Sequence, residues 1–192
     1  MRRIIALLVM SCFVAGTFAK VPVMGNKIRL TDNWEFLRQD VGNIWELVRP
    51  IKKGQPEEQP IWTKVTLPHC FNAEDAVDPD LNYYQGPGWY KTRLKLDNPY
   101  PDGRMVLEFE GAGQKTDVYV YMTKVGSHVG GYDSSNVDIT DAVRAFLASK
   151  DAERFGGEIP LSIRCDNTRD AEMIPSDLSD FNLYGGIYRY LN

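Results

Sequence analysis

Residues Asp180 to Asn192 read Asp-Phe-Asn-Leu-Tyr-Gly-Gly-Ile-Tyr-Arg-Tyr-Leu-Asn. A polar residue, an aromatic residue and two glycines precede a run of alternating aromatic and aliphatic residues, which is typical of a loop that leads directly into a β-strand. The two glycines allow backbone conformations that other residues avoid. The sequence ends within this predicted strand, and we therefore expect these 192 residues to be the front of a longer protein.

Working outward from this stretch, most of the chain shows the two-residue period of antiparallel strands that are buried on one face. Trp34 and Phe36 share one face and predict a first edge strand. Four later segments have the same period, and their predicted inward-facing residues are Tyr90, Thr92, Leu94, Leu96, Met105, Leu107, Phe109, Val118, Val120, Met122, Ile159, Leu161, Ile163 and Cys165. Gly126 to Tyr132 predicts a tight hairpin or a bulge.

One short helix is predicted after Asp138, with Thr140 as its N-cap and an apolar face formed by Val143, Phe146 and Leu147. Seven or eight short strands with a single helical turn predict an all-β fold, a β-sandwich of the jelly-roll kind. Residues 70–88 and 166–179 form two long polar loops, and loops of that length in a compact domain are usually functional.

The first 19 residues have the pattern of a secretory signal peptide. Arg2 and Arg3 precede the apolar run 4–14, and residues 17–19 form a small-x-small cleavage signal, so the mature domain is expected to span residues 20–192. The alternative is a lipoprotein signal that ends at Cys12. Either route predicts an exported protein, periplasmic or extracellular, with an outer-membrane lipoprotein as the alternative.

Without Arg2 and Arg3, the chain has 20 basic and 26 acidic residues, a formal balance of −6. An acidic chain without basic runs argues against nucleic acid as a partner. If Cys12 is removed with the signal peptide, Cys70 and Cys165 are the two remaining cysteines. They form either a disulfide or two buried free thiols. No zinc-type spacing of Cys and His occurs in the sequence, and we expect no metal and no cofactor.

Nine short sequence motifs occur in the order seen in the sugar-binding domain of glycoside hydrolase family 2, which this chain resembles over about residues 28 to 192. They are Asn33-Trp34-Glu35-Phe36, Val65-Thr66-Leu67-Pro68-His69, Gly88-Trp89-Tyr90, Leu107-Glu108-Phe109-Glu110-Gly111-Ala112, Asp117-Val118-Tyr119-Val120, Gly130-Gly131-Tyr132, Asp138-Ile139-Thr140, Asp166-Asn167 and Tyr184-Gly185-Gly186-Ile187-Tyr188-Arg189. The resemblance implies a galactose-binding-domain-like jelly roll at the N-terminus of a β-galactosidase-like enzyme.

In such an enzyme an immunoglobulin-like sandwich and a TIM barrel follow, and both catalytic glutamates lie in the barrel. The resemblance therefore implies a retaining glycosidase whose catalytic residues are absent from these 192 residues. The implied partners are a carbohydrate with a terminal β-glycoside, a galactoside among the candidates, and the missing downstream domains. A homo-oligomer is left open.

The resemblance also implies substrate-binding residues in the two polar loops. By motif, Asp180 is placed where the family carries an Asp that reaches the sugar, and Gln85 or Asn82 where it carries a second polar residue. A carboxylate aimed at sugar hydroxyls accepts charge-assisted hydrogen bonds, which gives specificity. Asp180 could instead cap the turn, and Gln85 and Asn82 could be ordinary loop residues.

Other side chains have a functional and a structural interpretation. Tyr83, Tyr84 and Trp89 could stack on a sugar or belong to the core. The other residues considered are His69 and His128 as structural histidines, Asp75, Asp78 and Asp80 as a calcium alternative, Arg189 as paired inside the sheet or at a domain interface, and Glu108 and Glu110 on a solvated sheet face. Two other functions stay open, a freestanding carbohydrate-binding module and a packing domain.

Overall fold

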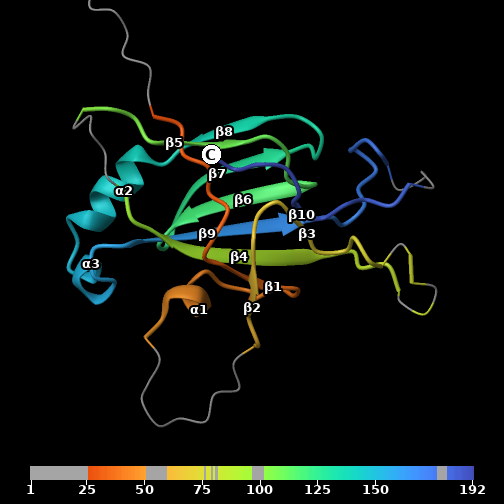
Figure 1. The fold of residues 1–192 in the computed structure, drawn as a ribbon, viewed down its shortest axis with the longest axis horizontal. Coiled ribbons are helices and arrows are strands. Elements are labelled where there is room, and N and C mark those ends of the chain that lie inside the picture. The colour runs from red at the N-terminus through yellow and green to blue at the C-terminus, as the bar shows by residue number, and fades with distance from the viewer. Residues whose placement is uncertain are drawn as a thin grey trace, which may run out of the picture.

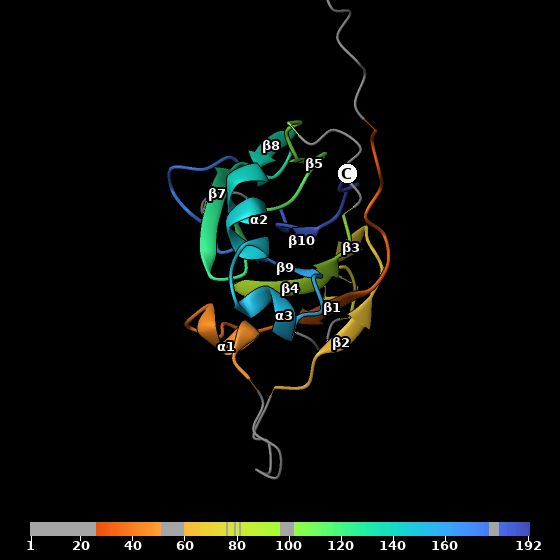
Figure 2. The same cartoon turned by 90° about the vertical axis from the view of Figure 1, so that its left-hand side faces the viewer.

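The computed structural model of the chain describes residues 26–50, 60–75, 77–78, 80, 82–96, 102–176 and 181–192. These residues fold into two stacked layers of antiparallel strands with three short helices (Figures 1 and 2). The all-β jelly-roll sandwich predicted from the alternation is thus confirmed. The predicted signal peptide, including Cys12, lies outside the described residues.

The larger layer is a six-stranded sheet in the order β2-β1-β4-β9-β6-β7. Its strands are β1 (Trp34–Leu37), β2 (Thr63–Val65), β4 (Pro87–Leu94), β6 (Lys115–Val120), β7 (Thr123–Val129) and β9 (Ile159–Asp166). Because β1 pairs with both β2 and β4, the prediction that it forms an edge was wrong, and β2 is the edge strand. The register of β6 and β7 shifts between Val118 and Tyr119, and the unpaired residue is Val125, directly before the predicted stretch Gly126 to Tyr132.

The second layer is formed by two strand pairs and by the end of the chain (Figure 2). Its strands are β3 (His69–Cys70), β5 (Val106–Phe109), β8 (Ser135–Asp138) and β10 (Gly186–Ile187). Glu108 exchanges both backbone hydrogen bonds with Asn192, so β5 lies between β8 and the last residues of the chain. The opening stretch of sequence therefore supplies β10 and a further extended segment of this layer.

The helices are α1 (Trp45–Val48), α2 (Thr140–Leu147) and α3 (Asp151–Arg154). Only α2 was predicted, and its capping was predicted wrongly. The carboxylate of Asp138 accepts the Thr140 backbone N–H at 2.9 Å, while the Thr140 hydroxyl accepts the Met105 N–H at 2.8 Å. No helix among the described residues is long and apolar enough to cross a membrane.

Both sheets bury one face in a common core between the layers. The predicted inward face is fully buried in β9, where Ile159, Leu161, Ile163 and Cys165 are at most 1% exposed, and the alternation itself is clearest in β6. Met122, Leu96 and Leu147 were predicted to face the core but are 44%, 37% and 47% exposed. Met122 lies in the turn between β6 and β7, and Leu96 lies beyond the end of β4.

The two cysteines of the described chain are free thiols, which decides between the two alternatives left by the sequence. Cys165 is fully buried on β9, and burial raises its pKa to about 12. Cys70 lies at the end of β3, where burial raises its pKa as well. Both side chains are therefore protonated at neutral pH and act as small apolar or weakly hydrogen-bonding groups.

Candidate functional site

Both long polar loops meet at one end of the sandwich, on the right in Figure 1. The antiparallel register explains this, since Pro87 at the start of β4 and Lys115 at the start of β6 both pair with Asp166 at the end of β9. In the second layer, Gly186 of β10 pairs with Cys70 of β3 and forms a bridge with Gly113. We call this region the loop end, formed by residues 70–75, 82–87, 166–176 and 181–186.

Asn72 links two of these loops although it is fully buried. Its amide nitrogen donates to the carbonyl of Leu183 at 2.8 Å, and its amide oxygen accepts the N–H of Gly185 at 2.9 Å. The Cys70 thiol donates to the same oxygen at 3.3 Å. A buried amide that is fully hydrogen-bonded holds its neighbours in one arrangement, because breaking any bond leaves an unpaired polar group.

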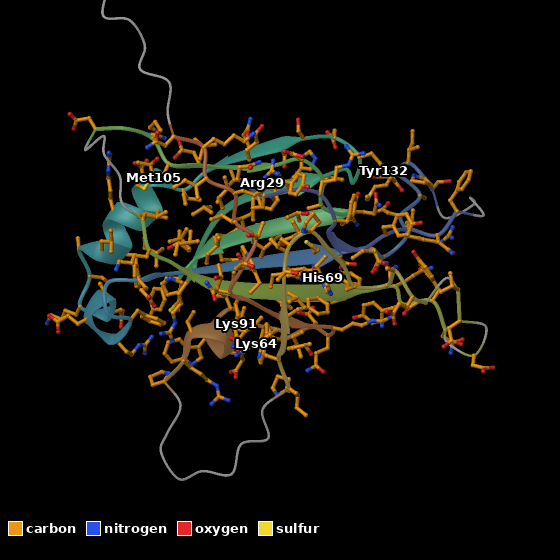
Figure 3. All side chains as sticks on the ribbon, viewed as in Figure 1. Arg29, Lys64, His69, Lys91, Met105 and Tyr132 are labelled. Carbon is orange, nitrogen blue, oxygen red and sulfur yellow. The ribbon has the colours of Figure 1, made fainter. Side chains whose placement is uncertain are left out.

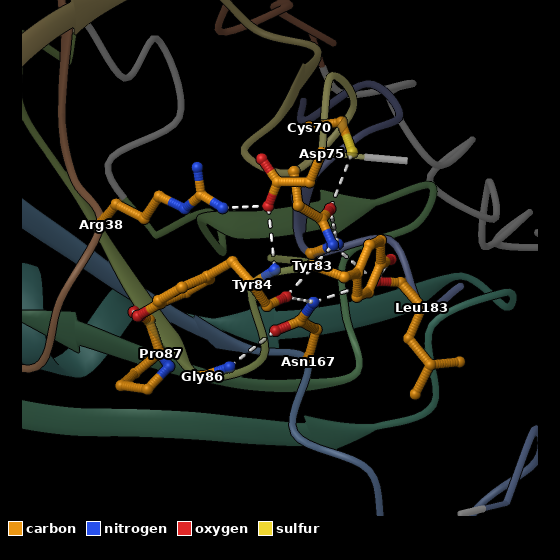
Figure 4. Close-up of polar contacts among 11 residues, drawn as sticks. Arg38, Cys70, Asp75, Tyr83, Tyr84, Gly86, Pro87, Asn167 and Leu183 are labelled. Carbon is orange, nitrogen blue, oxygen red and sulfur yellow. Dashed lines mark hydrogen bonds and ion pairs between the residues drawn. The ribbon is translucent and has the colours of Figure 1, made fainter. Parts of the chain in front are cut away.

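Asn167 links the 166–176 loop to the 82–87 and 181–186 segments, and it too is fully buried. Its nitrogen donates to the carbonyls of Tyr84 and Leu183, both at 2.9 Å, and its oxygen accepts the Gly86 N–H at 2.9 Å. Asn72 also donates to the Tyr84 carbonyl at 3.4 Å. The two asparagines thus share two acceptors and cross-link segments separated by up to 113 residues of sequence (Figure 4).

Asp75 fixes the start of the 82–87 segment. Its carboxylate accepts the Tyr84 N–H at 2.9 Å and forms an ion pair with Arg38, whose guanidinium lies over the Tyr84 ring at 4.5 Å (Figure 4). Only 6% of Asp75 is exposed. Asp78 has a structural partner as well, since its carboxylate accepts the Asp80 backbone N–H at 3.0 Å.

The aromatic residues proposed as a stacking platform serve the scaffold instead. The Tyr83 hydroxyl donates to the Leu183 carbonyl, and burial raises its pKa to about 12, which keeps that proton in place. The Tyr84 hydroxyl donates to Pro87, and Trp89 is 3% exposed against the ring of Tyr119. Trp89 is therefore buried, whereas Tyr83 and Tyr84 are half-buried residues whose hydroxyls brace the loop backbone.

Gln85 and Asn82 are exposed on the segment that the asparagines and Asp75 hold in place. Asp180, the third predicted site residue, lies outside the described residues. The structure thus brings the loop of Gln85 and Asn82 and the 181–186 segment together at one end. Contact with a sugar remains a prediction for all three residues.

Two exposed aromatic residues at the loop end were not predicted from the sequence. Phe181 is 71% exposed and Tyr184 is 47% exposed, and Tyr184 lies edge-on to Tyr188 with ring centroids 6.5 Å apart. Aromatic residues in an alternating pattern are usually assigned to a strand, but Phe181 and Tyr184 lie in the segment before β10. Their place before the double glycine was the available signal.

Gly185 and Gly186 have steric reasons to be glycine. A Cβ on Gly185 would overlap the ring of Phe71. Gly186 has a φ of 111°, and a Cβ there would lie 2.6 Å from the His69 carbonyl oxygen. The double glycine therefore lets the end of the chain cross closely over β3, which aligns β10 with the loop end.

The remaining candidates have structural partners. His69 Nδ1 lies 2.8 Å from the Tyr90 hydroxyl, and His128 Nε2 lies 3.0 Å from the Asp133 carboxylate. Glu108 forms an ion pair with Lys27, and the Asn192 amide donates to Glu110. Arg189 is exposed, and its backbone N–H donates to Gly111.

Most of the chain matches a known protein family. Residues 45–191 match the family described as "Glycosyl hydrolases family 2, sugar binding domain". The chain belongs to this family. The resemblance inferred from nine sequence motifs is thereby confirmed at the level of the family and of the sugar-binding domain.

This family 2 domain is similar to the crystal structure of Parabacteroides merdae β-glucuronidase with glycerol in its active site. The identity is 76% and the TM-score 0.83, over 91% of this chain and 22% of that one. A Bacteroides fragilis β-glucuronidase is 32% identical over 66% of this chain and 16% of its own length. A Thermoanaerobacter pseudethanolicus β-galactosidase is 26% identical over 82% of this chain and 19% of its own length.

The family 2 domain thus spans about a fifth of the length of the proteins that it matches. The high identity to a β-glucuronidase means that the narrower prediction of a β-galactosidase lacks specific support.

Proposed function

We propose that this family 2 sugar-binding domain serves a β-glucuronidase-type enzyme that is exported from the cytoplasm. The observation that carries the proposal is the 76% identity to the Parabacteroides merdae β-glucuronidase over 91% of the chain. The β-galactosidase relative, at 26% identity, gives much weaker support for a galactoside. The signal-peptide pattern of residues 1–19 is the basis for export.

In this proposal the loop end contributes to the sugar pocket. The hydrogen bonds of Asn72, Asn167 and Asp75 hold the loops rigidly, and the exposed side chains of Gln85 and Asn82 project from them. Asp180 comes immediately before Phe181 in the same region of the chain. Site residues on a braced scaffold need less ordering when a sugar binds, which favours affinity and specificity.

The catalytic step is assigned to residues beyond this domain. Retaining hydrolysis needs two carboxyl groups about 5 Å apart, one as nucleophile and one as acid and base. Two acidic side chains at the loop end have other partners, since Asp75 pairs with Arg38 and Asp170 with Lys115. The domain's proposed role is therefore recognition, with the immunoglobulin-like and barrel domains of the family supplying the rest.

Kinetics of the protein expressed from its complete coding sequence test the proposal. We expect 4-nitrophenyl β-D-glucuronide to be hydrolysed with a kcat/KM at least tenfold above that of the matching galactoside. Residues 20–192 expressed alone should hydrolyse neither substrate. A preference for the galactoside would overturn the assigned substrate, and hydrolysis by residues 20–192 would show that the catalytic groups lie within them.

The complete protein and residues 20–192 also test the alternative function, a freestanding carbohydrate-binding module. A module would bind glucuronides through residues 20–192 with the affinity of the complete protein. The proposal instead predicts that most of the affinity is lost, because the pocket is only partly formed by the loop end. Equal affinities would therefore favour the module.

A further inference from the structure

A cavity of about 1140 Å³ lies on the six-stranded sheet, on the side of β2, β1 and β4. Its lining shares no residue with the loop-end segments described above. The volume is somewhat above the 300–1,000 Å³ that is roughly typical of sites for one small molecule. It can therefore accommodate a ligand longer than a single sugar unit.

The register of the strands builds a polar row across this cavity. Glu35 of β1 is opposite Lys64 of β2 on one side and opposite Lys91 of β4 on the other, and Lys91 is opposite Ser162 of β9. Neighbouring strands are about 4.8 Å apart, so the row presents one polar group every few ångströms along a line. Figure 3 labels Lys64 and Lys91 on the side of the sheet where β2, β1 and β4 lie.

The charges in the cavity balance. Its basic side chains are Lys64, Lys91 and Arg93, and its acidic side chains are Asp32, Glu35 and Glu158. Of these, Lys91 and Glu35 are 3.3 Å apart, so they neutralise each other at the centre of the row. A cavity with equal numbers of both signs favours a neutral ligand over a strongly charged one.

Apolar groups flank the polar row. Leu47 and Val48 of α1 line one side, and Phe155, which follows α3, lines another with the Arg93 guanidinium 5.2 Å from its ring centroid. The Lys91 ammonium lies 4.0 Å from the centroid of Trp62. Thr92 and Ser162 also line the cavity, and the Thr92 hydroxyl donates to the Asn33 carbonyl at 2.8 Å. Most small-molecule pockets are largely apolar, whereas this one combines many donors and acceptors with a few apolar surfaces.

We propose that this cavity binds a neutral oligosaccharide at a site separate from the loop end, so that the domain carries a second sugar-binding surface. A sugar chain offers rows of hydroxyl groups for the Lys64–Glu35–Lys91 row and apolar ring faces for the flanking side chains. Hydroxyls both donate and accept hydrogen bonds, which matches alternating cations and carboxylates. The site would hold polymeric substrate near the enzyme without taking part in hydrolysis.

Calorimetric titration of the protein expressed from its complete coding sequence tests the site. The probes are cellohexaose, mannohexaose and xylohexaose, with hexagalacturonic acid as the charged comparison and an excess of glucuronic acid present to occupy a glucuronide pocket. We expect at least one neutral hexasaccharide to bind. The double variant Lys64→Ala/Arg93→Ala should weaken that binding at least tenfold, because both exposed side chains line the cavity.

Lys124→Ala is the matched control, since Lys124 lies on β7 of the same sheet, outside the cavity, and pairs with Asp117. Its affinity for the hexasaccharide should stay within twofold of the parent protein. The double variant should keep its melting temperature and its kcat/KM for 4-nitrophenyl β-D-glucuronide, which separates this site from the proposed function. Binding by none of the neutral probes, binding by the acidic probe alone, or an equal loss in Lys124→Ala would overturn the proposal.

Discussion

Asn72 and Asn167 are the residues on which the geometry of the loop end depends most directly. Each makes at least three hydrogen bonds from a position with no solvent exposure. An asparagine in a polar loop is unremarkable in sequence, and only its partners in space reveal its role.

Replacing Asn167 by Ala should destabilise the domain strongly. The change leaves the Gly86 N–H without its acceptor and weakens the bonding of the Tyr84 and Leu183 carbonyls, at a cost of about 2 to 4 kcal/mol. Urea unfolding of parent and variant measures the difference. Asn136→Ala, at an exposed position of β8, is the control and should stay within about 0.5 kcal/mol. Equal effects at both positions would contradict the assigned role.

Gly185 should tolerate no side chain while Phe71 is present. Gly185→Ala forces the new methyl group into the Phe71 ring, and overpacking of this kind costs about 1 to 3 kcal/mol. The measurement is a double-mutant cycle by chemical unfolding. In a Phe71→Leu background the cost of Gly185→Ala should fall by at least half, because the clashing atoms are gone. An unchanged cost would mean that the backbone, not the ring, requires glycine.

His69 should make the stability of the domain pH-dependent. Burial lowers the pKa of His69 below its usual value of 6.5, so the unfolded state binds a proton that the folded state resists. The contribution of His69 is therefore present above pH 6.5 and is lost as the pH falls below it. Melting temperatures between pH 7.5 and pH 5 measure this loss.

The chain has only two histidines, which makes the control simple. His69→Gln should flatten the dependence of melting temperature on pH in this range. His128→Gln should leave most of it in place, because His128 lies near the surface beside the exposed Asp133. If the pH dependence of the melting temperature disappears in His128→Gln instead, His128 and not His69 is responsible for it.

At the scale of elements, α2 closes one end of the sandwich, opposite the loop end (Figures 1 and 2). Phe146 anchors it, 4% exposed, with the rings of Tyr121 and Phe155 at centroid distances of 5.2 and 5.8 Å. The short helix could not hold its shape in isolation, so packing on this cluster stabilises it.

Phe146→Ala should therefore cost about 3 to 5 kcal/mol, the range for removing a buried aromatic side chain. Leu147→Ala is a control on the same helix, since 47% of Leu147 is exposed, and should cost about 1 kcal/mol or less. Unfolding in urea gives both values. Similar losses at the two positions would show that the orientation of α2 differs from the one described.

The helical period predicted all three apolar residues of α2 as one buried face, and Leu147 departs from it. In contrast, β5 and β6 follow their predicted two-residue period. The error for β1 concerned its position, because it was predicted to lie at an edge of the sheet. Periodicity reports which side chains share a face, but the number of neighbours that a strand has depends on residues far away in sequence. β1 is flanked by β2 and β4, and nothing in its own four residues encodes that.

For the protein as a whole, the proposed glucuronidase role makes Asp180, which directly precedes the loop-end segment 181–186 in sequence, the decisive side chain for sugar recognition. In the protein expressed from its complete coding sequence, Asp180→Ala should lower kcat/KM for 4-nitrophenyl β-D-glucuronide at least tenfold, because a charge-assisted hydrogen bond to the sugar is lost. Asp170→Ala, which removes a surface ion pair with Lys115, is the control and should change kcat/KM by less than threefold. Equal kinetics for parent and Asp180→Ala would favour a packing role for the domain.

The sequence alone determined the class of fold and the family. Alternation along each strand, the glycines before β10 and nine ordered motifs are local properties, and local properties can be read without knowing which segments meet.

Only the tertiary structure decided which residues support that end and which remain exposed. Asn72, Asn167 and Leu183 act together across 111 residues of sequence, and Trp89 is buried on the outer face of its sheet. The Lys64–Glu35–Lys91 row likewise exists only because three strands pair in one register. Hydrogen bonds, burial and cavities depend on distances between atoms, and folding alone sets those distances for residues far apart in the chain.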